Sequence, residues 1–173
     1  MFKEEAAWIR WILGRQDLPE GGTVADIGSS TLFARAVGQP YVEGQVLQPL
    51  RDRGLSITHV DAVEDPGVDV VADLADPATD LPGLIGGQAD LVLCLSVLAF
   101  VRDLPPALAH VASAVKPGGL IVATTPRRYR VTRNPVDNGW RPTPTELLDR
   151  LQADGVRFER IAAAELVIHD NEE

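Results

Sequence analysis

The sequence predicts an α/β fold, a doubly wound and mostly parallel sheet with helices on both faces, in which the final strands form an antiparallel hairpin. The first observation is a series of continuous apolar runs, because parallel strands covered by helices are apolar on both faces. The second is that these runs alternate with helical or loop segments, an order typical of a parallel sheet. The third is size: 173 residues with 45% hydrophobic content can supply one core, so residues 1–173 are expected to form a single domain.

The first elements have recognisable boundaries. Residues 1–18 are expected to form an amphipathic amino-terminal helix with acidic residues in its first turn, and Pro19 to Gly22 close a turn after it. The strand that follows, from Thr23 to Gly28, ends on a carboxylate and a turn of small residues. Four more apolar runs predict strands at 55–62, 68–74, 89–98 and 119–126.

Two helices and a final pair of strands complete the predicted domain. Prolines suited to a first helical turn begin one helix, which stops at Lys-Pro-Gly-Gly (116–119). The other helix has Thr143 as its N-cap and Glu146 completing a capping box. Residues 156–170 are predicted to be two short strands in a hairpin, followed by an acidic tail at 169–173.

Composition and charge restrict the classes of partner. A formal charge of −9 and a pI near 4.8 make the whole protein repel phosphate backbones and anionic lipids, so nucleic-acid and membrane-surface roles are not expected. The only cysteine, Cys94, cannot form an internal disulfide, and the amino terminus does not read as a secretory signal, so a cytoplasmic location is expected. The three histidines have no metal-ligand spacing, and no metal site is expected. The expected partner is a small molecule.

Carboxylates end three successive predicted strands. Ligands of doubly wound sheets bind beyond the carboxyl ends of the strands, which places residues 26–31, Asp61, Asp73 and residues 94–97 along one edge. Asp61 can accept hydrogen bonds from the vicinal hydroxyls of a ribose, and Asp73 from an exocyclic amine such as adenine N6. Asp26 would attract a cationic ligand and repel a pyrophosphate. The pattern predicts a nucleoside that carries a positive centre.

In several segments the sequence resembles the class I S-adenosylmethionine-dependent methyltransferases. VADIGSST at 24–31 is similar to their first motif, ITHVD at 57–61 to the acidic end of their second strand, and VVADLAD at 70–76 to their adenine-contacting segment. The stretch 89–126 resembles their fourth strand, the helix after it and their fifth strand, and 141–161 their final helix and strand. The resemblance implies a Rossmann-like fold, S-adenosylmethionine as cofactor and methyl transfer as activity.

The resemblance also implies a role for each residue that matches a family motif. Asp26, Gly28 and Ser30 would lie at the methionine end of the cofactor, and Asp61 at its ribose. Asp73 and Leu74 would contact the adenine, and Cys94, Leu95 and Ser96 would flank the sulfonium. Helix capping or turn formation is the structural alternative for the Asp61 and Asp73 carboxylates. A small apolar filler is the alternative for Cys94, because no neighbour in sequence would lower the pKa of its thiol.

The first motif departs from the family pattern of two or three alternating glycines. Only Gly28 remains, with Ser30 and Leu32 at the other places, and the loss of glycine restricts close backbone approach and positive φ. Two hypotheses therefore stay open: an active methyltransferase, and a catalytically silent domain that acts as a partner or regulatory subunit. A nicotinamide-dependent oxidoreductase is disfavoured, because Ser30 and Phe33 stand where a dinucleotide fingerprint needs glycines.

The loop at 127–142 is expected to overhang the cofactor edge on the substrate side. Methyl transfer depends chiefly on alignment, but a hydroxyl or amine acceptor profits from a base, for which Asp137 and Tyr129 are the candidates. An Asx turn is the alternative for Asp137. The other substrate-side candidates are Arg127, Arg128 and Arg130, which could clamp a carboxylate or phosphate, and Trp140, which could wall the pocket; salt bridges and packing are the alternatives.

Overall fold

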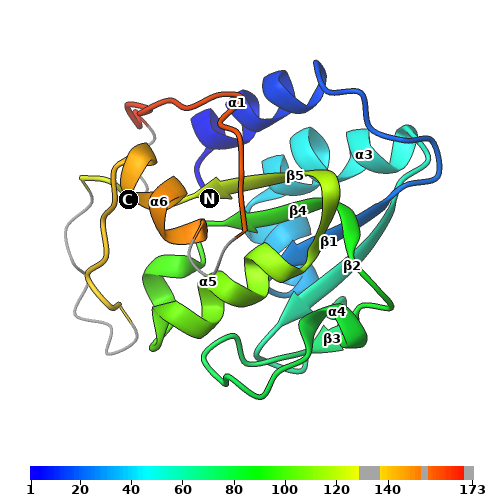
Figure 1. Ribbon diagram of the computed structural model, residues 1–173. Coiled ribbons are helices and arrows are strands. Elements are labelled where there is room, and N and C mark those ends of the chain that lie inside the picture. Colours follow the sequence, from blue (N-terminus) through cyan, green and yellow to red (C-terminus); the bar gives the residue numbers. More distant parts are fainter. Residues whose placement is uncertain (129–136, 153–155, 170–173) are drawn as a thin grey trace.

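The computed structural model describes residues 1–128, 137–152 and 156–169, and one five-stranded sheet lies at its centre (Figure 1). The strand order is β3-β2-β1-β4-β5, and all neighbouring strands pair in parallel. The strands are β1 (Thr23–Ile27), β2 (Ser56–Asp61), β3 (Val70–Val71), β4 (Ala89–Leu95) and β5 (Val115–Thr124). The order runs outward in both directions from β1, which confirms the doubly wound sheet that the apolar runs predict.

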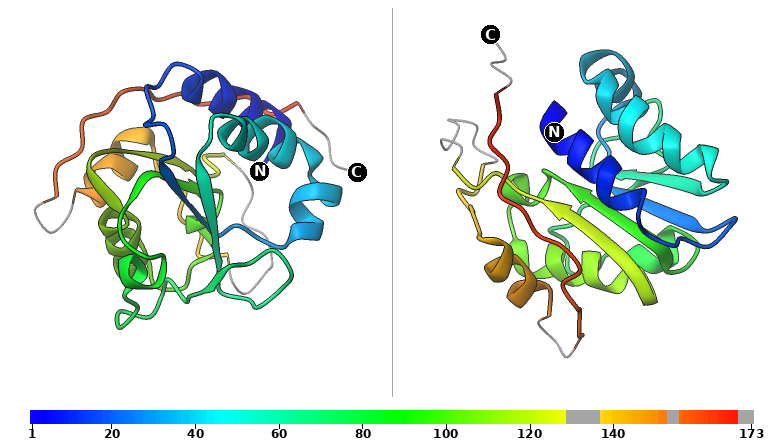
Figure 2. Two further views of the ribbon diagram at one scale, coloured as in Figure 1. Left: turned by 90° about the vertical axis from the view of Figure 1, so that its right-hand side faces the viewer. Right: turned by 90° about the horizontal axis from the view of Figure 1, so that it is seen from above.

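Helices cover both faces of this sheet (Figure 2). Residues of α1 (Lys3–Leu13), α2 (Pro40–Val42), η2 (Glu43–Leu47) and α3 (Gln48–Asp52) pack on one face, and the short helix η1 (Ala34–Gly38) precedes α2. Residues of α4 (Leu81–Leu84), α5 (Leu104–Ser113) and α6 (Pro144–Leu151) pack on the other face, together with the turn η3 (Leu98–Phe100) after β4. Both faces are therefore buried, as a parallel sheet requires.

The buried side chains form two cores, one on each face of the sheet. Ala25 and Ile27 of β1 belong to the core under α5, whereas Val24 belongs to the core under α1. Successive side chains of a strand point to opposite faces, so the side chain of Asp26 must point to the α1 face. Asp26 is only 5% exposed, which makes it a buried carboxylate inside the sheet.

The structure confirms the predicted capping box at Thr143 and Glu146, but it places the Lys-Pro-Gly-Gly segment differently from the prediction. The capping box of α6 is confirmed, because Thr143 Oγ1 accepts the Glu146 N–H at 3.2 Å and the Glu146 carboxylate accepts the Thr143 N–H at 2.7 Å. The Lys-Pro-Gly-Gly segment lies inside β5 and does not precede it. Residues 116–119 form a bulge there, since Ala89 pairs with Val115 but Leu91 pairs with Leu120.

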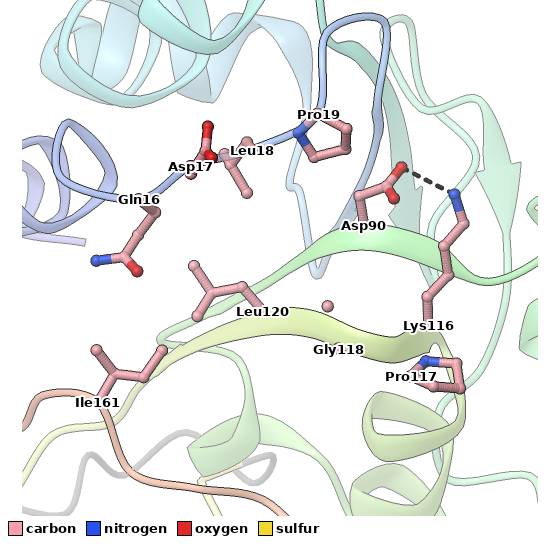
Figure 3. Close-up of a pocket in the computed structure, with 11 residues that line it drawn as sticks. Gln16, Asp17, Leu18, Pro19, Asp90, Lys116, Pro117, Gly118, Leu120 and Ile161 are labelled. Carbon is pink, nitrogen blue, oxygen red and sulfur yellow. Dashed lines mark hydrogen bonds and ion pairs between the residues drawn. The ribbon is translucent and has the colours of Figure 1, made fainter.

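The predicted antiparallel hairpin at residues 156–170 is wrong. Every strand pair is parallel, and the described residues 156–169 contain no strand. Side chains hold this segment to the rest of the protein, because Arg160 donates to Thr145 Oγ1 and the His169 N–H donates to Glu4. Ile161 of this segment and Leu120 of β5 both line a cavity of about 300 Å³ (Figure 3). The apolar pattern indicated strand propensity, but strand formation also needs an edge within hydrogen-bonding reach.

The same cavity borders a polar junction at the amino ends of three strands (Figure 3). Asp90 of β4 accepts hydrogen bonds from the N–H and the hydroxyl of Thr23 in β1, at 2.8 and 3.0 Å. It also accepts one from Lys116 Nζ in β5, at 2.9 Å. The backbone N–H of Thr23, followed by the Lys116 ammonium, lowers the pKa of Asp90. This junction fixes the sheet at the edge opposite to the predicted ligand edge.

We expect Asp90→Asn to lower the free energy of unfolding at pH 7 by about 1 to 2 kcal/mol, because it removes charge-assisted hydrogen bonds. The pKa of Asp90 is lowered in the folded state, so the stabilisation is present above the unfolded value of about 3.9 and is lost as the pH falls through the folded value. Denaturant unfolding of both proteins between pH 7 and pH 3 should show the difference shrinking on acidification. Asp17→Asn, the same change in the same cavity, should have little effect.

Candidate functional site

The carboxyl ends of the strands bring the predicted cofactor residues to one edge of the sheet. Ile27 of β1 pairs with Val60 of β2 and with Cys94 of β4, so the turn after β1 lies between the ends of its two neighbours. Asp61 of β2 pairs with Val71 of β3 at the same edge. The edge contains, from β3 to β5, Asp73 and Leu74, then Asp61, then Gly28 to Ser30, then Leu95 and Ser96, then Thr124. The strand ends predicted from sequence are therefore neighbours in space.

Gly28 begins a tight turn directly after β1. Its φ of 71° lies in the left-handed region that favours glycine, and the N–H groups of Gly28 and Ser29 both donate to Val60 O, at 2.8 and 3.0 Å. A Cβ atom at Gly28 would overlap the side chain of Val97. Glycine is thus required here by conformation and by space, and Val97 closes over the turn.

The peptide units around Ser30 are held from both sides by charged side chains. Ser30 has a φ of 59°, which is unusual for a residue with a side chain. Its N–H donates to Asp61 Oδ2 at 2.8 Å, and its carbonyl accepts from Arg35 Nη1 at 2.6 Å. Arg35 also donates to the carbonyls of Ser29, at 3.1 Å, and Gly67, at 2.7 Å. Arg35 and Asp61 therefore hold the conformation of this turn, which contains a single glycine, Gly28.

Arg35 places a positive charge beside this turn. The residue is 3% exposed, and its Nε atom is buried without a hydrogen-bond partner among the described residues. Its bonded partners are carbonyl oxygens, and none of the ion pairs among the described residues includes it. A guanidinium remains charged in proteins, so this part of the edge has a positive charge that forms no ion pair with a carboxylate of the described residues.

Asp61 and Asp73 both form hydrogen bonds within turns, the structural role that the sequence offered as the alternative to cofactor binding. Asp61 Oδ1 accepts the Val63 N–H at 3.2 Å, and Asp73 Oδ1 accepts the Ala75 N–H at 2.8 Å. Asp73 is exposed and Asp61 is half-buried. An ionised carboxylate has about four acceptor sites, so both side chains retain capacity for a ligand.

Asp26 forms a buried pair with His59 of β2. Asp26 Oδ2 lies 2.8 Å from His59 Nδ1, and the two residues are 5% and 7% exposed. Arg51 Nη2 lies 3.3 Å from His59 Nε2, and Arg51 also pairs with Glu43. A guanidinium can only donate, so His59 Nε2 accepts a hydrogen bond from Arg51, and the Nδ1–H group of His59 donates one to Asp26. The structure therefore places Asp26 on the α1 face of the sheet, with His59 as its partner and Arg51 of α3 behind it, rather than at the open edge.

The end of β4 combines a buried thiol with a polar turn. Cys94 is fully buried, and burial, followed by the nearby negative charge of Asp26, raises the pKa of its thiol to about 12. This thiol packs as an apolar filler in the core under α5. Ser96 has a φ of 60°, and its N–H donates to the carbonyl and the hydroxyl of Thr124, at 3.1 and 3.0 Å. Its hydroxyl donates to Glu5 Oε1 of α1 at 3.0 Å.

The substrate-side candidates are bound to neighbouring residues. The Asp137 carboxylate accepts two hydrogen bonds from Arg141, at 3.1 and 2.8 Å, and one from the Gly139 N–H, which is the Asx turn. Arg127 and Arg128 lie 3.7 and 3.9 Å from the Glu165 carboxylate. Trp140 packs against the core under α5. Tyr129 and Arg130 lie outside the described residues.

Asn138 is a positioning residue that the sequence did not single out. Its side-chain amide donates to the carbonyls of Leu98 and Val101, both at 2.8 Å, and its backbone N–H donates to Ala99 at 2.9 Å. These bonds attach the segment after residue 136 to η3, next to the end of β4. The Asp-Asn-Gly triplet indicated a turn, but the contact with η3 has no local signal.

No group of three or more His, Cys, Asp or Glu side chains in the described ranges could hold a metal ion. In the same ranges, no helix combines the length and apolar character needed to cross a bilayer.

Residues 41–161 match a family model described as "Methyltransferase domain", which covers more than half of the chain. Among solved structures, the cyclase SpnF is 20% identical, with a TM-score of 0.53, over 86% of this chain and 55% of its own. A chain of the structure described as "Complex between the Haloferax volcanii Trm112 methyltransferase activator and the putative methyltransferase" is 23% identical, with a TM-score of 0.43, over 67% of this chain and 51% of its own. The chain thus spans about half the length of these two structures. No curated protein is similar enough to count as a match.

We expect Gly28→Ala to destabilise the protein more than Gly21→Ala. Both glycines have nearly the same φ, 71° and 69°, so each alanine incurs a similar strain of about 1 kcal/mol. Only at Gly28 does the new methyl group meet another side chain, that of Val97, which should add about 1 to 3 kcal/mol. Denaturant unfolding measures both values. Equal losses of stability in the two variants would contradict the close contact between Gly28 and Val97.

Proposed function

The chain belongs to the methyltransferase domain family, and from this premise we propose that it is an S-adenosylmethionine-dependent methyltransferase. The proposed acceptor is a hydroxyl or amine group of a small molecule. The observation that carries the proposal is the strand order, which puts Asp61 and Asp73 on the same edge as the turn at Gly28 to Ser30. In open α/β sheets a ligand binds at this edge, next to the strand where the order reverses.

The charges along the edge fit the chemical groups of this cofactor. The Asp61 carboxylate, with free acceptor sites, suits the ribose hydroxyls, and the exposed Asp73 carboxylate suits the adenine amine. The buried guanidinium of Arg35, which lacks a carboxylate partner in the described chain, suits the methionine carboxylate. When bound, S-adenosylmethionine supplies a methyl group on a positively charged sulfur.

The residues of the chain would act by holding and aligning the reactants. The turn around Ser30 is fixed by Asp61 and Arg35, so its backbone is already ordered before a ligand binds. Val97 follows β4, and its side chain lies against Gly28, so it provides apolar cover beside this turn. Apolar cover excludes water from the reacting groups, which is the main protection that methyl transfer needs.

On the acceptor side we propose that Arg128 attracts an anionic substrate. Its side chain is 86% exposed, and its ion pair with Glu165, at 3.9 Å, is long enough for a better-placed carboxylate or phosphate to replace it. The base proposed for the acceptor proton remains Asp137 or Tyr129. Asp137 would first have to leave its bonds with Arg141.

A catalytically silent domain is the second proposed function, and the state of Asp137 favours it. The carboxylate expected to act on the acceptor has a side chain that is 0% exposed and is paired with Arg141. A protein that binds cofactor but transfers no methyl group to any hydroxyl or amine compound would fit this second function. Release of S-adenosylhomocysteine in the presence of such compounds would exclude it.

Asp61→Asn should weaken the binding of S-adenosylhomocysteine and of adenosine about tenfold or more, because the acceptor of the ribose hydroxyls loses its charge and one of its two oxygens. Isothermal titration calorimetry on the full chain measures both affinities. Asp149→Asn, the same change on the exposed face of α6, is the matched control and should leave them unchanged. If the folded wild-type protein gave no heat with millimolar S-adenosylhomocysteine, the proposed function itself would be rejected.

A further inference from the structure

The first turn of α1 brings a buried carboxylate to the carboxyl edge of the sheet. In Figure 1 the amino end of α1 lies near the carboxyl end of β5, and Glu5 Oε1 accepts the Ser96 hydroxyl at 3.0 Å. The Thr124 hydroxyl of β5 lies 3.4 Å from the Ser96 hydroxyl. We propose that the Glu5 carboxylate makes this site prefer a positively charged cofactor, S-adenosylmethionine, over the neutral thioether S-adenosylhomocysteine. The inference rests on the function proposed above.

Glu5 is held in place by both of its carboxylate oxygens. While Oε1 faces Ser96, Oε2 accepts the Phe2 N–H at 3.0 Å and so closes the first turn of the helix. The residues before α1 are themselves fixed, because the Tyr41 hydroxyl donates to the Met1 carbonyl at 2.7 Å. Glu5 is therefore a fixed charge at the end of β4, not a mobile surface side chain.

The charge of Glu5 has no cationic partner in the described part of the chain. Glu5 is 8% exposed, and its bonded partners are a hydroxyl and a backbone N–H. Burying a carboxylate without a cation costs free energy, which a positive ligand at this edge would recover in part. Charges in a protein interact across several ångströms with an effective dielectric constant of about 20, enough to change an affinity tenfold.

The conformation of Ser96 supports a functional role for this contact. Ser96 lies in the left-handed region, with a φ of 60°, and the bonds of its N–H to Thr124 hold it there. In this conformation its hydroxyl meets Glu5. Residues with side chains adopt this region at a cost, and they do so mainly at ligand sites and switches.

Calorimetric titrations of the full chain with the two cofactor forms test the proposal. Wild-type protein should bind S-adenosylmethionine about tenfold more tightly than S-adenosylhomocysteine. Glu5→Gln keeps the shape and removes the charge: its amide oxygen can still accept the Phe2 N–H, and its NH2 group can donate to the Ser96 hydroxyl. The affinity for S-adenosylmethionine should therefore fall about tenfold while that for S-adenosylhomocysteine changes little. Glu5→Asp, which keeps the charge, should retain part of the preference.

Glu4→Gln is the matched control. Glu4 lies in the same helical turn, but it accepts the His169 N–H at 2.9 Å instead of facing Ser96, so its variant should keep the wild-type preference. The proposal is overturned if wild-type protein binds both forms equally, a result that needs no variant to fold. It is also overturned if Glu5→Gln retains the preference or weakens both forms alike. Absence of binding by either form would reject the proposed function and this inference together.

Discussion

The parallel pairing of β1 with β2 on one side and β4 on the other is the constraint on which the rest of the structure depends. The pairs Ile27 with Val60 and Ile27 with Cys94 fix the ends of the three central strands at the same level. The turns that follow these strands then lie along one edge, while the two faces are covered by helices. A shift of one residue in either pairing would move every side chain of a strand to the opposite buried face and so exchange the residues of the two cores.

This constraint also explains why a chain with one glycine in its first motif can keep a tight turn after β1. At Gly28 a Cβ atom would overlap the side chain of Val97. At Ser30 the turn needs positive φ but not the absence of a side chain, and hydrogen bonds from Arg35 and to Asp61 hold that conformation. Stabilisation by side chains thus replaces the conformational freedom that a second glycine would provide.

The sequence was sufficient for the sheet and for the strand-end residues, but not for contacts between distant elements. Continuous apolar runs identify the strands because burial on both faces leaves a local signal, and Asp61 and Asp73 follow from the strand ends. The prediction of a hairpin at 156–170 was wrong, because an apolar pattern cannot show whether the edge of β5 is within hydrogen-bonding reach of this segment. Asp26 was expected at the edge, yet only the register of β1 and β2 reveals that His59 faces it. Glu5 and Ser96 are 91 positions apart, and no local pattern connects them.

The two turns at the edge are built in the same way. Among the described residues, Ser30 and Ser96 are the only residues with side chains that have positive φ, and they follow β1 and β4, the neighbouring central strands. Each donates its N–H to a residue at the end of the adjacent strand, and each is bound by a charged side chain from a helix, Arg35 or Glu5. Strained conformations persist only where the surroundings hold them. Because each helix supplies both the restraint and a buried charge, loss of either side chain would relax the turn and change the charge of the edge at once.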